Sequence, residues 1–157
     1  MKIVLMTVGK TTNANLRPLI EEYTARVNRF IPFEIIEIPD IKTTRKLTPQ
    51  LQKQTEGEAI LARLQPSDHL VLLDERGKEP TSREFAEALA RKEHTVAHRL
   101  VFLVGGPYGF SPDIYSRGNE KMSLSRMTFP HEMVRLFFAE QLYRAYSILH
   151  NLPYHHD

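Results

Sequence analysis

The final segment of the chain, residues 150–157, carries side chains that could take part in acid–base chemistry and in base recognition. It reads "HNLPYHHD" and contains His150, Tyr154, His155 and His156. An imidazole titrates close to neutral pH and can exchange a proton, and a tyrosine ring can stack on a nucleic-acid base. A frayed terminus is the ordinary alternative, but Pro153 restricts the backbone of this segment.

Adjacent histidines could also bind a metal ion, because imidazole is a common metal ligand. No convincing set of further ligands accompanies His155 and His156, and the chain contains no cysteine. The absence of cysteine also excludes disulfides and thiolate metal sites. We therefore expect no metal site in this protein.

A long helix is predicted before this segment, from Pro130 to about His150. Its apolar residues cover most of its circumference: Met133, Val134, Leu136, Phe137, Phe138, Leu142, Tyr143, Ile148 and Leu149. A helix that is apolar nearly all round is buried on more than one side. We therefore expect one side of this helix to face a sheet and the other to face a second copy of the chain.

The polar residues of the same helix fall on one stripe: Glu140, Arg144, Ser147 and Asn151. Glu140 and Arg144 are one helical turn apart and can form an ion pair. A solvent-exposed face is the ordinary explanation of such a stripe. Because this stripe adjoins the histidines and tyrosine of the final segment, it is also a candidate part of a site.

Three loops are candidates for a small-molecule site: "LDERGK" at 73–78, "GGPYG" at 105–109 and "SLSRMTF" at 123–129. The first two follow predicted strands, and the third leads into the last helix. Glycine-containing turns are common in ordinary loops, but the strand ends of an open parallel sheet form one crevice where ligands bind. If these loops meet at neighbouring strand ends, they form a small-molecule pocket.

Two nucleotide-binding patterns are not matched. "VGKTT" at 8–12 resembles the end of a phosphate-binding loop, but Val4 stands where the pattern requires its first glycine. "GGPYG" differs from the dinucleotide fingerprint, because Pro107 stands at the second glycine position and lacks an amide hydrogen. Neither residues 8–12 nor the loop 105–109 is therefore expected to bind a nucleotide phosphate in these ways.

The elements that must position these residues alternate between strands and helices. Strands are predicted at 3–8, 33–38, 69–74 and 99–105, and most of them are apolar on both faces. Helices are predicted at 14–30, from Thr48-Pro49, from the capping box "TSRE" at 81–84 and from Ser111-Pro112. Strands of this kind lie in a mostly parallel sheet with helices on both faces. The predicted fold class is α/β, with residues 1–157 forming a single domain.

Length and composition fit one globular domain of 157 residues. The net charge is +2, too small by itself to indicate a nucleic-acid partner. The apolar runs are far shorter than the roughly 18 residues of a membrane span, and "MKIVLMTVGK" has too short an apolar run for a secretion signal. We therefore expect a cytoplasmic protein.

The stretch 41–54 is locally basic, and it contains no acid. Its cations are Lys42, Arg45, Lys46 and Lys53. Such a stretch is either a solvated loop or a contact to an RNA backbone.

Five longer stretches occur in this order: "LVLLDERGKEPTSREFA", "FLVGGPYGF", "SLSRMTFPHEMVR", "EQLYRAYSI" and "LPYHHD". In order and spacing they resemble the RlmH family, which consists of S-adenosyl-L-methionine-dependent enzymes of the SPOUT class. The resemblance covers essentially the whole chain. It implies a SPOUT-type fold with a C-terminal trefoil knot, and a homodimer. It also implies N3-methylation of a pseudouridine in helix 69 of large-subunit (23S) ribosomal RNA on assembled ribosomes, with no DNA or membrane partner.

The resemblance assigns cofactor binding to Leu73, Gly105, Leu124, Ser125, Arg126, Met127, Thr128 and Phe129. These residues lie in the three candidate loops. It associates Arg144, Tyr154 and His155 with substrate binding and catalysis. In the family a lysine or arginine commonly follows the tail histidine, whereas this chain has His156 and Asp157. A fixed positive charge is thus replaced by a titratable one.

Methyl-transfer chemistry suggests a role for each of these three residues. The sulfonium of the cofactor already activates the methyl group, so the protein must chiefly align donor, methyl carbon and acceptor nitrogen. The acceptor N3 must also lose its proton. His155 is a plausible base and Arg144 a plausible stabiliser of the anionic ring. Tyr154 would stack on the target base, in a site of its own or of the opposite subunit.

Two other function classes are open. A non-catalytic ribosome-binding factor would have no reason to retain an S-adenosylmethionine site, so cofactor binding distinguishes it from an enzyme. A Rossmann-type methyltransferase acting on a small molecule should carry a glycine motif after its first strand, and "VGKTT" does not supply one.

Overall fold

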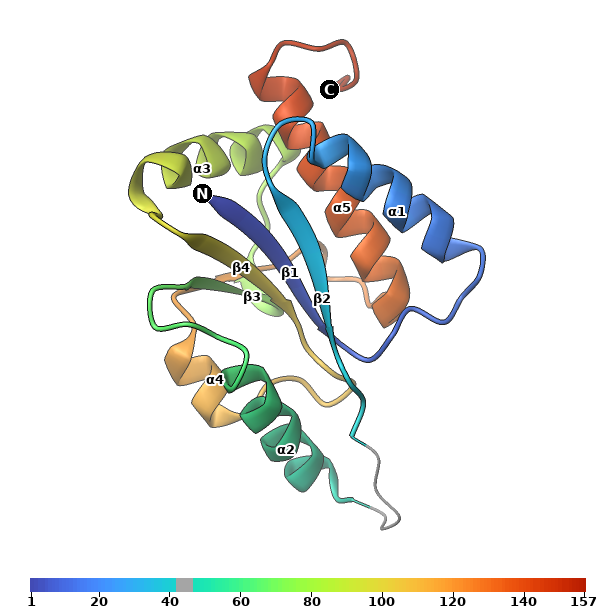
Figure 1. Cartoon of the computed structure of the whole chain (residues 1–157), viewed down its shortest axis with the longest axis vertical. Helices are drawn as coiled ribbons and strands as arrows, with labels where there is room; N and C mark the ends of the chain where they lie inside the picture. Colours follow the sequence, from blue (N-terminus) through green and yellow to red (C-terminus); the bar gives the residue numbers. More distant parts are fainter. Residues whose placement is uncertain (42–46) are drawn as a thin grey trace.

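The computed structural model describes residues 1–41 and 47–157, so Lys42, Arg45 and Lys46 of the basic stretch lie outside the described residues. Within them, five strands and five helices alternate along the chain (Figure 1). In chain order they are β1 (Lys2–Val8), α1 (Leu16–Val27), β2 (Phe33–Ile38), α2 (Pro49–Leu61), β3 (His69–Lys78), α3 (Ser82–Thr95), β4 (Arg99–Val104), α4 (Pro112–Arg117), β5 (Glu120–Met122) and α5 (His131–Leu149).

The strands form one sheet in the order β2-β1-β4-β3-β5, and each pairing between these strands is parallel. At the centre, Ile3 of β1 pairs with Leu100 of β4, and Leu5 pairs with Phe102. All four of these residues are buried. Central strands covered on both faces read as continuous apolar runs, which is why the sequence predicts them well. The α/β class with a mostly parallel sheet is confirmed.

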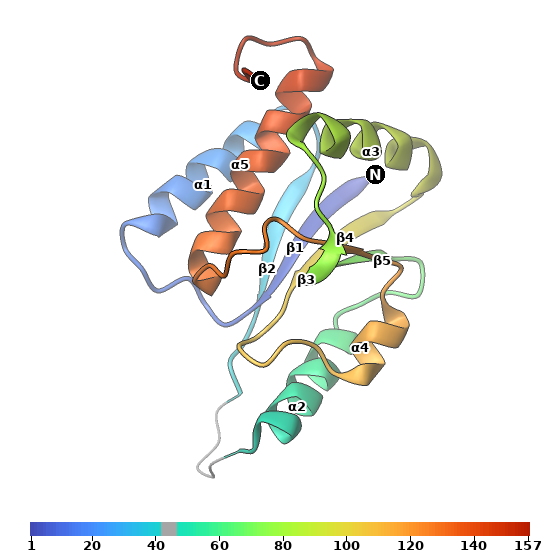
Figure 2. The same cartoon turned by 180° about the vertical axis from the view of Figure 1, so that it is seen from behind.

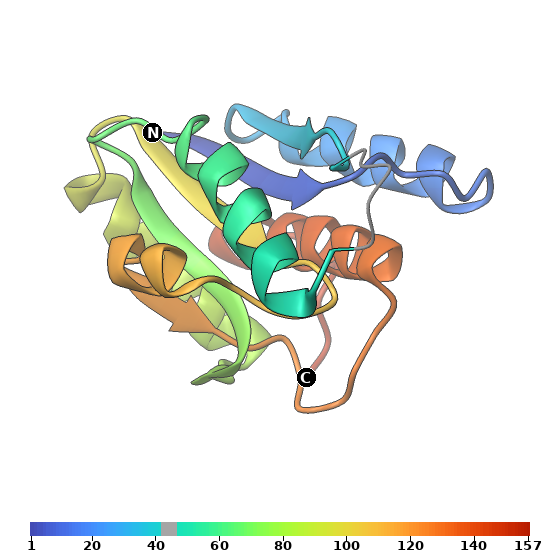
Figure 3. The same ribbon diagram turned by 90° about the horizontal axis from the view of Figure 1, so that it is seen from below.

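Helices cover both faces of the sheet. Because successive strand residues point to opposite faces, Ile3 and Leu5 pack with α1, α3 and α5, whereas Val4 and Met6 pack with α2 and α4. Figures 1 and 2 show α1 and α5 running side by side. Seen from below, α2 crosses in front of the strands (Figure 3). The trefoil knot stays a prediction from the family resemblance.

Three helices begin with the caps that the sequence predicts. The hydroxyl oxygens of Thr48, Thr81 and Ser111 accept hydrogen bonds from backbone amides at the starts of α2, α3 and α4, at 3.1, 3.1 and 3.4 Å. A hydroxyl in this position satisfies one of the amides that a helix start leaves without a partner. These bonds set where the helices begin.

The sheet differs from the prediction at one edge. β3 continues to Lys78 rather than ending near Asp74, and β5 pairs with it at the edge of the sheet. β5 is the short polar stretch "EKM", so it has no apolar run to reveal it. The first part of β3 pairs with β4 on one side and with β5 on the other, and after an irregularity between Leu73 and Lys78 the strand pairs with Met122 a second time.

A buried cation, Arg135, ties the first turns of α5 to the loop after β1. Its side chain is almost wholly buried. Nη1 donates to the Thr11 hydroxyl at 2.9 Å, Nη2 donates to the Val8 carbonyl at 3.0 Å, and the Glu37 carboxylate lies 3.5 Å away. Burial lowers the pKa of Arg135, and the nearby carboxylates oppose this effect.

Glu132, one turn earlier, binds the same loop. Its carboxylate accepts from the backbone amides of Thr12 at 2.5 Å and Asn13 at 2.9 Å. The bond from the Asn13 amide is the largest cause of the lowered pKa of Glu132. Together, Glu132 and Arg135 fasten the start of α5 to the carboxyl end of β1.

We predict that Arg135→Met lowers the free energy of unfolding by about 2 kcal/mol, because it leaves the Val8 carbonyl and the Thr11 hydroxyl without their donor. Methionine keeps most of the volume, so cavity formation contributes little to the change. Urea unfolding followed by circular dichroism at fixed protein concentration measures it. The control is Lys2→Met, which removes a surface pair with Glu34 and should change stability by no more than about 1 kcal/mol. Equal losses for the two variants would contradict the prediction.

Candidate active site

The three loops selected from the sequence meet at one cavity of about 480 Å³. It lies at the carboxyl ends of β3 and β4, beside the start of α5. Of the residues assigned to the cofactor, it is lined by Leu73, Gly105, Leu124, Ser125, Met127, Thr128 and Phe129. The predicted convergence of the loops is therefore confirmed. The binding of a cofactor at these residues stays a prediction.

Arg126 is the one residue of the assigned set that does not line this cavity. Its side chain is 85% exposed, and its Nε lies 3.4 Å from the Glu79 carboxylate. A contact of Arg126 to a ligand in the cavity would therefore have to come from its backbone.

The loop 123–129 holds its shape through short-range hydrogen bonds. The Ser123 amide donates to the Lys78 carbonyl at 2.9 Å, which joins this loop to the end of β3. The Ser123 hydroxyl donates to the Ser125 carbonyl at 2.9 Å, and the Met127 amide donates to the Ser125 hydroxyl at 3.0 Å. These bonds place the backbone of the loop as one wall of the cavity.

In the loop 105–109, the backbone of Gly105 and Gly106 lies close to neighbouring side chains. A Cβ at Gly105 would lie 3.0 Å from the Phe110 ring, and a Cβ at Gly106 would collide with the Glu56 carboxylate of α2. Valine at position 105 would therefore push against Phe110 whether or not a ligand is present. A substitution at Gly105 would therefore change the packing against Phe110 and would not report on ligand binding alone.

The polar wall of the cavity was missed by the sequence analysis. Asp74 and Tyr115 face each other there, and the Tyr115 hydroxyl donates to Asp74 Oδ2. The Arg76 amide donates to Asp74 Oδ1 at 2.8 Å. Burial alone would raise the pKa of Asp74, but these hydrogen bonds outweigh it and lower the pKa. Asp74 directly follows Leu73 within β3, and its place in the candidate loop 73–78 was the signal that the sequence offered.

Basic side chains also line the same cavity. Lys53 from α2, Arg76 from β3 and His131 at the start of α5 belong to its wall. Lys53 is the described member of the locally basic stretch. Its position beside the cavity favours the view that at least this part of the stretch faces a ligand or substrate.

The segment after α5 folds back on the helix. Asn151 adopts a left-handed conformation with φ of 56°, and the Leu152 amide donates to the Ser147 carbonyl at 2.9 Å. Asparagine tolerates this conformation and ends helices in this way. The Tyr154 hydroxyl then donates to Glu140 Oε1 at 2.9 Å and lies 3.1 Å from the Tyr23 hydroxyl. The tail is therefore packed against α5 and α1, as expected from Pro153 and not as a frayed end.

Arg144 lies at the centre of the tail contacts. Its Nε and Nη2 donate to Glu140 Oε1 at 3.0 and 2.6 Å, which confirms the predicted ion pair. Its Nη1 lies 3.2 Å from His155 Nδ1, and its guanidinium carbon is 4.7 Å from the centre of the Tyr154 ring. Burial and the bonds to Tyr23 and Glu140 raise the pKa of Tyr154. The structure thus brings Arg144, Tyr154 and His155 together, as predicted.

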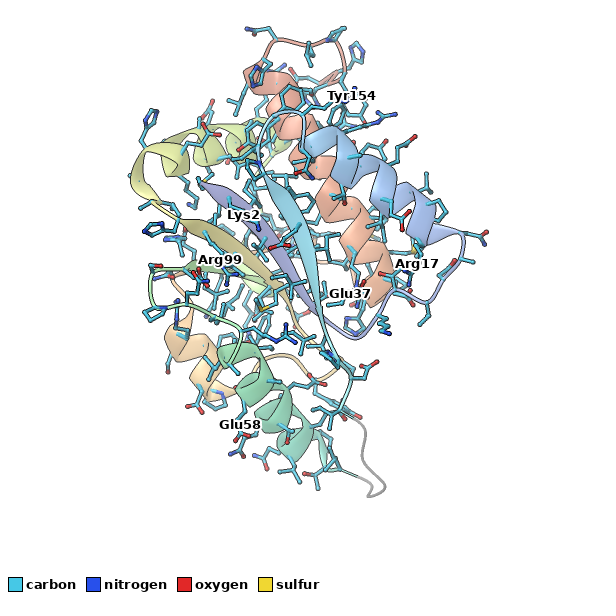
Figure 4. The ribbon with its side chains drawn as sticks, in the orientation of Figure 1. Lys2, Arg17, Glu37, Glu58, Arg99 and Tyr154 are labelled. Atoms are coloured by element: carbon cyan, nitrogen blue, oxygen red, sulfur yellow. The ribbon has the colours of Figure 1, made fainter. Side chains whose placement is uncertain are left out.

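The tail cluster and the cavity lie toward opposite ends of α5. Val134 lines the cavity and Arg144 carries the tail contacts, so the two are separated along the helix by about 15 Å. Figure 4 shows Tyr154 far from Glu37 and Arg17, which lie toward the end of α5 that adjoins the cavity. Within one chain, the tail therefore does not close the cavity.

A groove of about 410 Å³ lies between these two regions. It shares Leu124 and Phe129 with the cavity and contains Glu140 of the tail cluster. Phe137 also lines it and packs edge-to-face on Phe129, with ring centres 5.1 Å apart. The groove therefore presents a partly apolar surface along α5.

Packing within the same chain covers much of the apolar surface of α5 that the sequence assigned to a second copy of the chain. Tyr143 and Tyr146 contact aromatic rings near α1, namely Tyr23 and Phe30. Phe138 is completely buried in the core. The apolar surface of α5 that this packing leaves half-buried is therefore confined to residues near Phe137, which is less than the sequence suggested.

Within residues 1–41 and 47–157, no three His, Asp or Glu side chains gather in a group that could hold a metal ion. In the same part of the chain, every helix is too short or too polar to cross a bilayer.

Comparison with known proteins agrees with the fold. A family model described as "Predicted SPOUT methyltransferase" matches residues 1–155. Proteins named "Ribosomal RNA large subunit methyltransferase H" from Parabacteroides distasonis, Phocaeicola vulgatus and Porphyromonas gingivalis are 55%, 53% and 52% identical to this chain. Each alignment spans 157 residues and covers 100% of both proteins. With a match of this extent, the chain belongs to the RlmH family of SPOUT methyltransferases.

Proposed function

We propose that this protein transfers a methyl group from S-adenosyl-L-methionine to N3 of a pseudouridine in helix 69 of 23S ribosomal RNA, on assembled ribosomes. The family membership and the names of the relatives support action on large-subunit ribosomal RNA. The observation that carries the proposal is the cavity at the ends of β3 and β4, where the assigned cofactor residues meet. Such modification of ribosomes would take place in the cytoplasm.

The cavity suits a cofactor that has an adenine, a ribose and a charged amino-acid part but no phosphate. Apolar side chains such as Leu73, Leu124 and Phe129 can pack on the adenine ring. The backbone of the loops at 105–109 and 123–129 can bind its polar edges. Asp74, Lys53 and Arg76 offer groups of both charges for the amine and the carboxylate. When bound, the cofactor supplies a methyl group activated by its sulfonium.

The active site is proposed to be shared between two subunits of a homodimer. In one chain the tail cluster lies about 15 Å along α5 from the cavity. A second chain seated on the groove lined by Phe137 could bring its own tail to the mouth of the cavity. The half-buried apolar surface of α5 would be covered by the same contact.

In this site the protein would orient the acceptor and remove its proton. Tyr154 presents a ring face that can stack on the target base. His155 takes the N3 proton, and Arg144 remains charged and stabilises the anion that forms on the ring. The protein thus has two tasks: it removes the N3 proton, and it holds the acceptor nitrogen in line with the methyl group.

We predict that Thr128→Trp weakens the binding of S-adenosylmethionine by at least about tenfold, which is 1.4 kcal/mol. Thr128 is exposed and lines the cavity, so a large ring there should fill the cavity without disturbing the core. The matched control is Arg126→Trp, at a position whose side chain points away from the cavity. Isothermal titration calorimetry measures both. Wild-type affinity in both variants would place the cofactor elsewhere, and no binding by the wild type would favour the non-catalytic factor.

The dimer is tested by Phe137→Asp, which places a charge on the groove surface. Light scattering at micromolar concentration should give a dimer for the wild type and a monomer for this variant. Leu19→Asp, at an exposed position of α1, is the control and should remain dimeric. Phe138→Asp is unsuitable, because Phe138 is completely buried and the charge would unfold the chain. A monomeric wild type would contradict the proposed dimer.

A shared site also predicts complementation between two inactive variants. Thr128→Trp damages the cavity and His155→Ala damages the tail, so a mixed dimer has one intact site and one doubly damaged site. After random exchange of equal amounts, half of the dimers are mixed, and about a quarter of wild-type activity should return. If each subunit used its own tail, mixing would restore no activity.

Deleting residues 154–157 should leave folding and cofactor binding nearly intact. Methyl transfer should fall on the order of a hundredfold or more, the scale expected for losing an acid–base group. His155→Ala should reproduce much of this loss, and His156→Ala, at an exposed position, much less. The assay is incorporation of tritiated methyl groups into ribosomes that lack the modification, at saturating cofactor. A truncated protein working at the wild-type rate would show that the tail is not catalytic.

A further inference from the structure

Asp157 forms a polar bridge between α3 and the tail histidine. Arg83 Nε donates to both carboxylate oxygens of Asp157 at 2.9 Å, and Arg83 Nη2 lies 2.9 Å from Oδ2. His155 Nε2 lies 2.9 Å from Asp157 Oδ1. Arg83 stands in the first turn of α3, next to the residues that the Thr81 cap holds in place. The bridge therefore links the tail to a fixed helix start.

The two neighbours of His155 determine which ring nitrogen carries the proton in the neutral imidazole. A guanidinium has donors and no acceptor, so Nδ1, which faces Arg144 Nη1 at 3.2 Å, must accept. The proton of the neutral ring then lies on Nε2, which donates to the Asp157 carboxylate. Arg83, and after it His155, lower the pKa of Asp157 to about 2, so the carboxylate is ionised at neutral pH. Both contacts favour the same tautomer.

We propose that Asp157, anchored by Arg83, is a positioning residue that holds His155 as the Nε2–H tautomer with its Nδ1 lone pair available for the N3 proton of the substrate. This inference rests on the proposed function. In the free chain, Arg144 Nη1 occupies the place opposite Nδ1. When substrate binds, the N3–H group takes that place, and Arg144 is released toward the base that it stabilises.

In the proposed step the proton on N3 passes to His155. The N3–H bond breaks and an Nδ1–H bond forms, which leaves an imidazolium whose Nε2–H bond to Asp157 becomes charge-assisted and stronger. The electron pair on N3 forms the bond to the methyl carbon. The electrons of the broken carbon–sulfur bond remain on sulfur, which becomes a neutral thioether. A carboxylate behind an imidazole both fixes its orientation and stabilises the imidazolium.

Because Arg83 and Asp157 are exposed, losing their contacts should affect catalysis through His155 more than it affects folding stability. The side chains of Arg83 and Asp157 are 54% and 68% exposed, whereas that of His155 is only 12% exposed. Ion pairs between exposed side chains contribute little to folding. Variants at Asp157 should therefore fold normally, and a change in their activity would report on His155.

The test compares Asp157→Ala with Asp157→Asn, which keeps an acceptor oxygen but loses the charge. Nitrogen-15 NMR of the histidine rings reads the tautomer in the free protein, and methyl transfer to ribosomes lacking the modification gives kcat and KM. Asp157→Ala should lose the preference for Nε2–H and lower kcat on the order of tenfold, part of what a general base contributes. Asp157→Asn should fall between this variant and wild type. KM for the ribosome should change less than about twofold, because Asp157 does not bind the RNA.

A double variant separates positioning from a local packing effect. In a His155→Ala background, Asp157→Ala should cause no further loss, because its effect passes through the imidazole. Arg83→Ala should reproduce part of the Asp157→Ala effect. The controls on α3 are Glu87→Gln and Arg91→Ala, at exposed positions, and they should behave as wild type.

The outcomes distinguish this inference from the function on which it rests. If the wild type does not methylate ribosomes, the proposed function and the catalytic role of Asp157 both fail. If the wild type is active but Asp157→Ala keeps its kcat or its histidine tautomer, only the positioning role is wrong. An additive loss in the double variant would likewise overturn it.

Discussion

The packing of α5 across the sheet is the constraint on which the rest of this structure depends. One end of the helix borders the cavity through His131 and Val134, and the other end carries Arg144 and the tail. A helix is a rigid spacer of fixed rise per residue, so the two regions cannot approach each other while α5 stays intact. A site that uses both regions must therefore take them from different chains.

The register of α5 is maintained by polar contacts as well as by the core. Arg135 and Glu132 bind the loop after β1 at the start of the helix, while Ala139, Leu142 and Ala145 pack on the sheet side. A buried guanidinium is tolerated here because Nη1 and Nη2 have oxygen partners and the Glu37 carboxylate lies nearby, although Nε has no partner among the described residues. Such directional contacts allow little sliding of α5, so the loop 123–129 and the tail keep constant positions relative to the strand ends.

The tail cluster is organised around one carboxylate. Glu140 Oε1 accepts from Arg144 and from Tyr154, and Arg144 in turn contacts His155. Charged hydrogen bonds of this kind hold the side chains in defined orientations before any substrate arrives. Preorganised groups need no rearrangement against solvent during the reaction. Asp157 joins this cluster to Arg83.

Local patterns in the sequence were sufficient for the central strands, the three capped helices, the meeting of the candidate loops and the Glu140–Arg144 pair. The strands, caps and ion pair depend on residues that are close in sequence, and the meeting of the loops follows from the rule that the carboxyl ends of parallel strands form one crevice. β5 was missed because a three-residue strand with two charged residues and one methionine leaves no apolar pattern. The burial of Arg135, the outward direction of Arg126 and the difference between Phe137 and Phe138 were decided by packing between distant elements. The separation of cavity and tail also belongs to the tertiary structure, because it depends on where α5 crosses the sheet, and residue spacing alone does not contain that crossing.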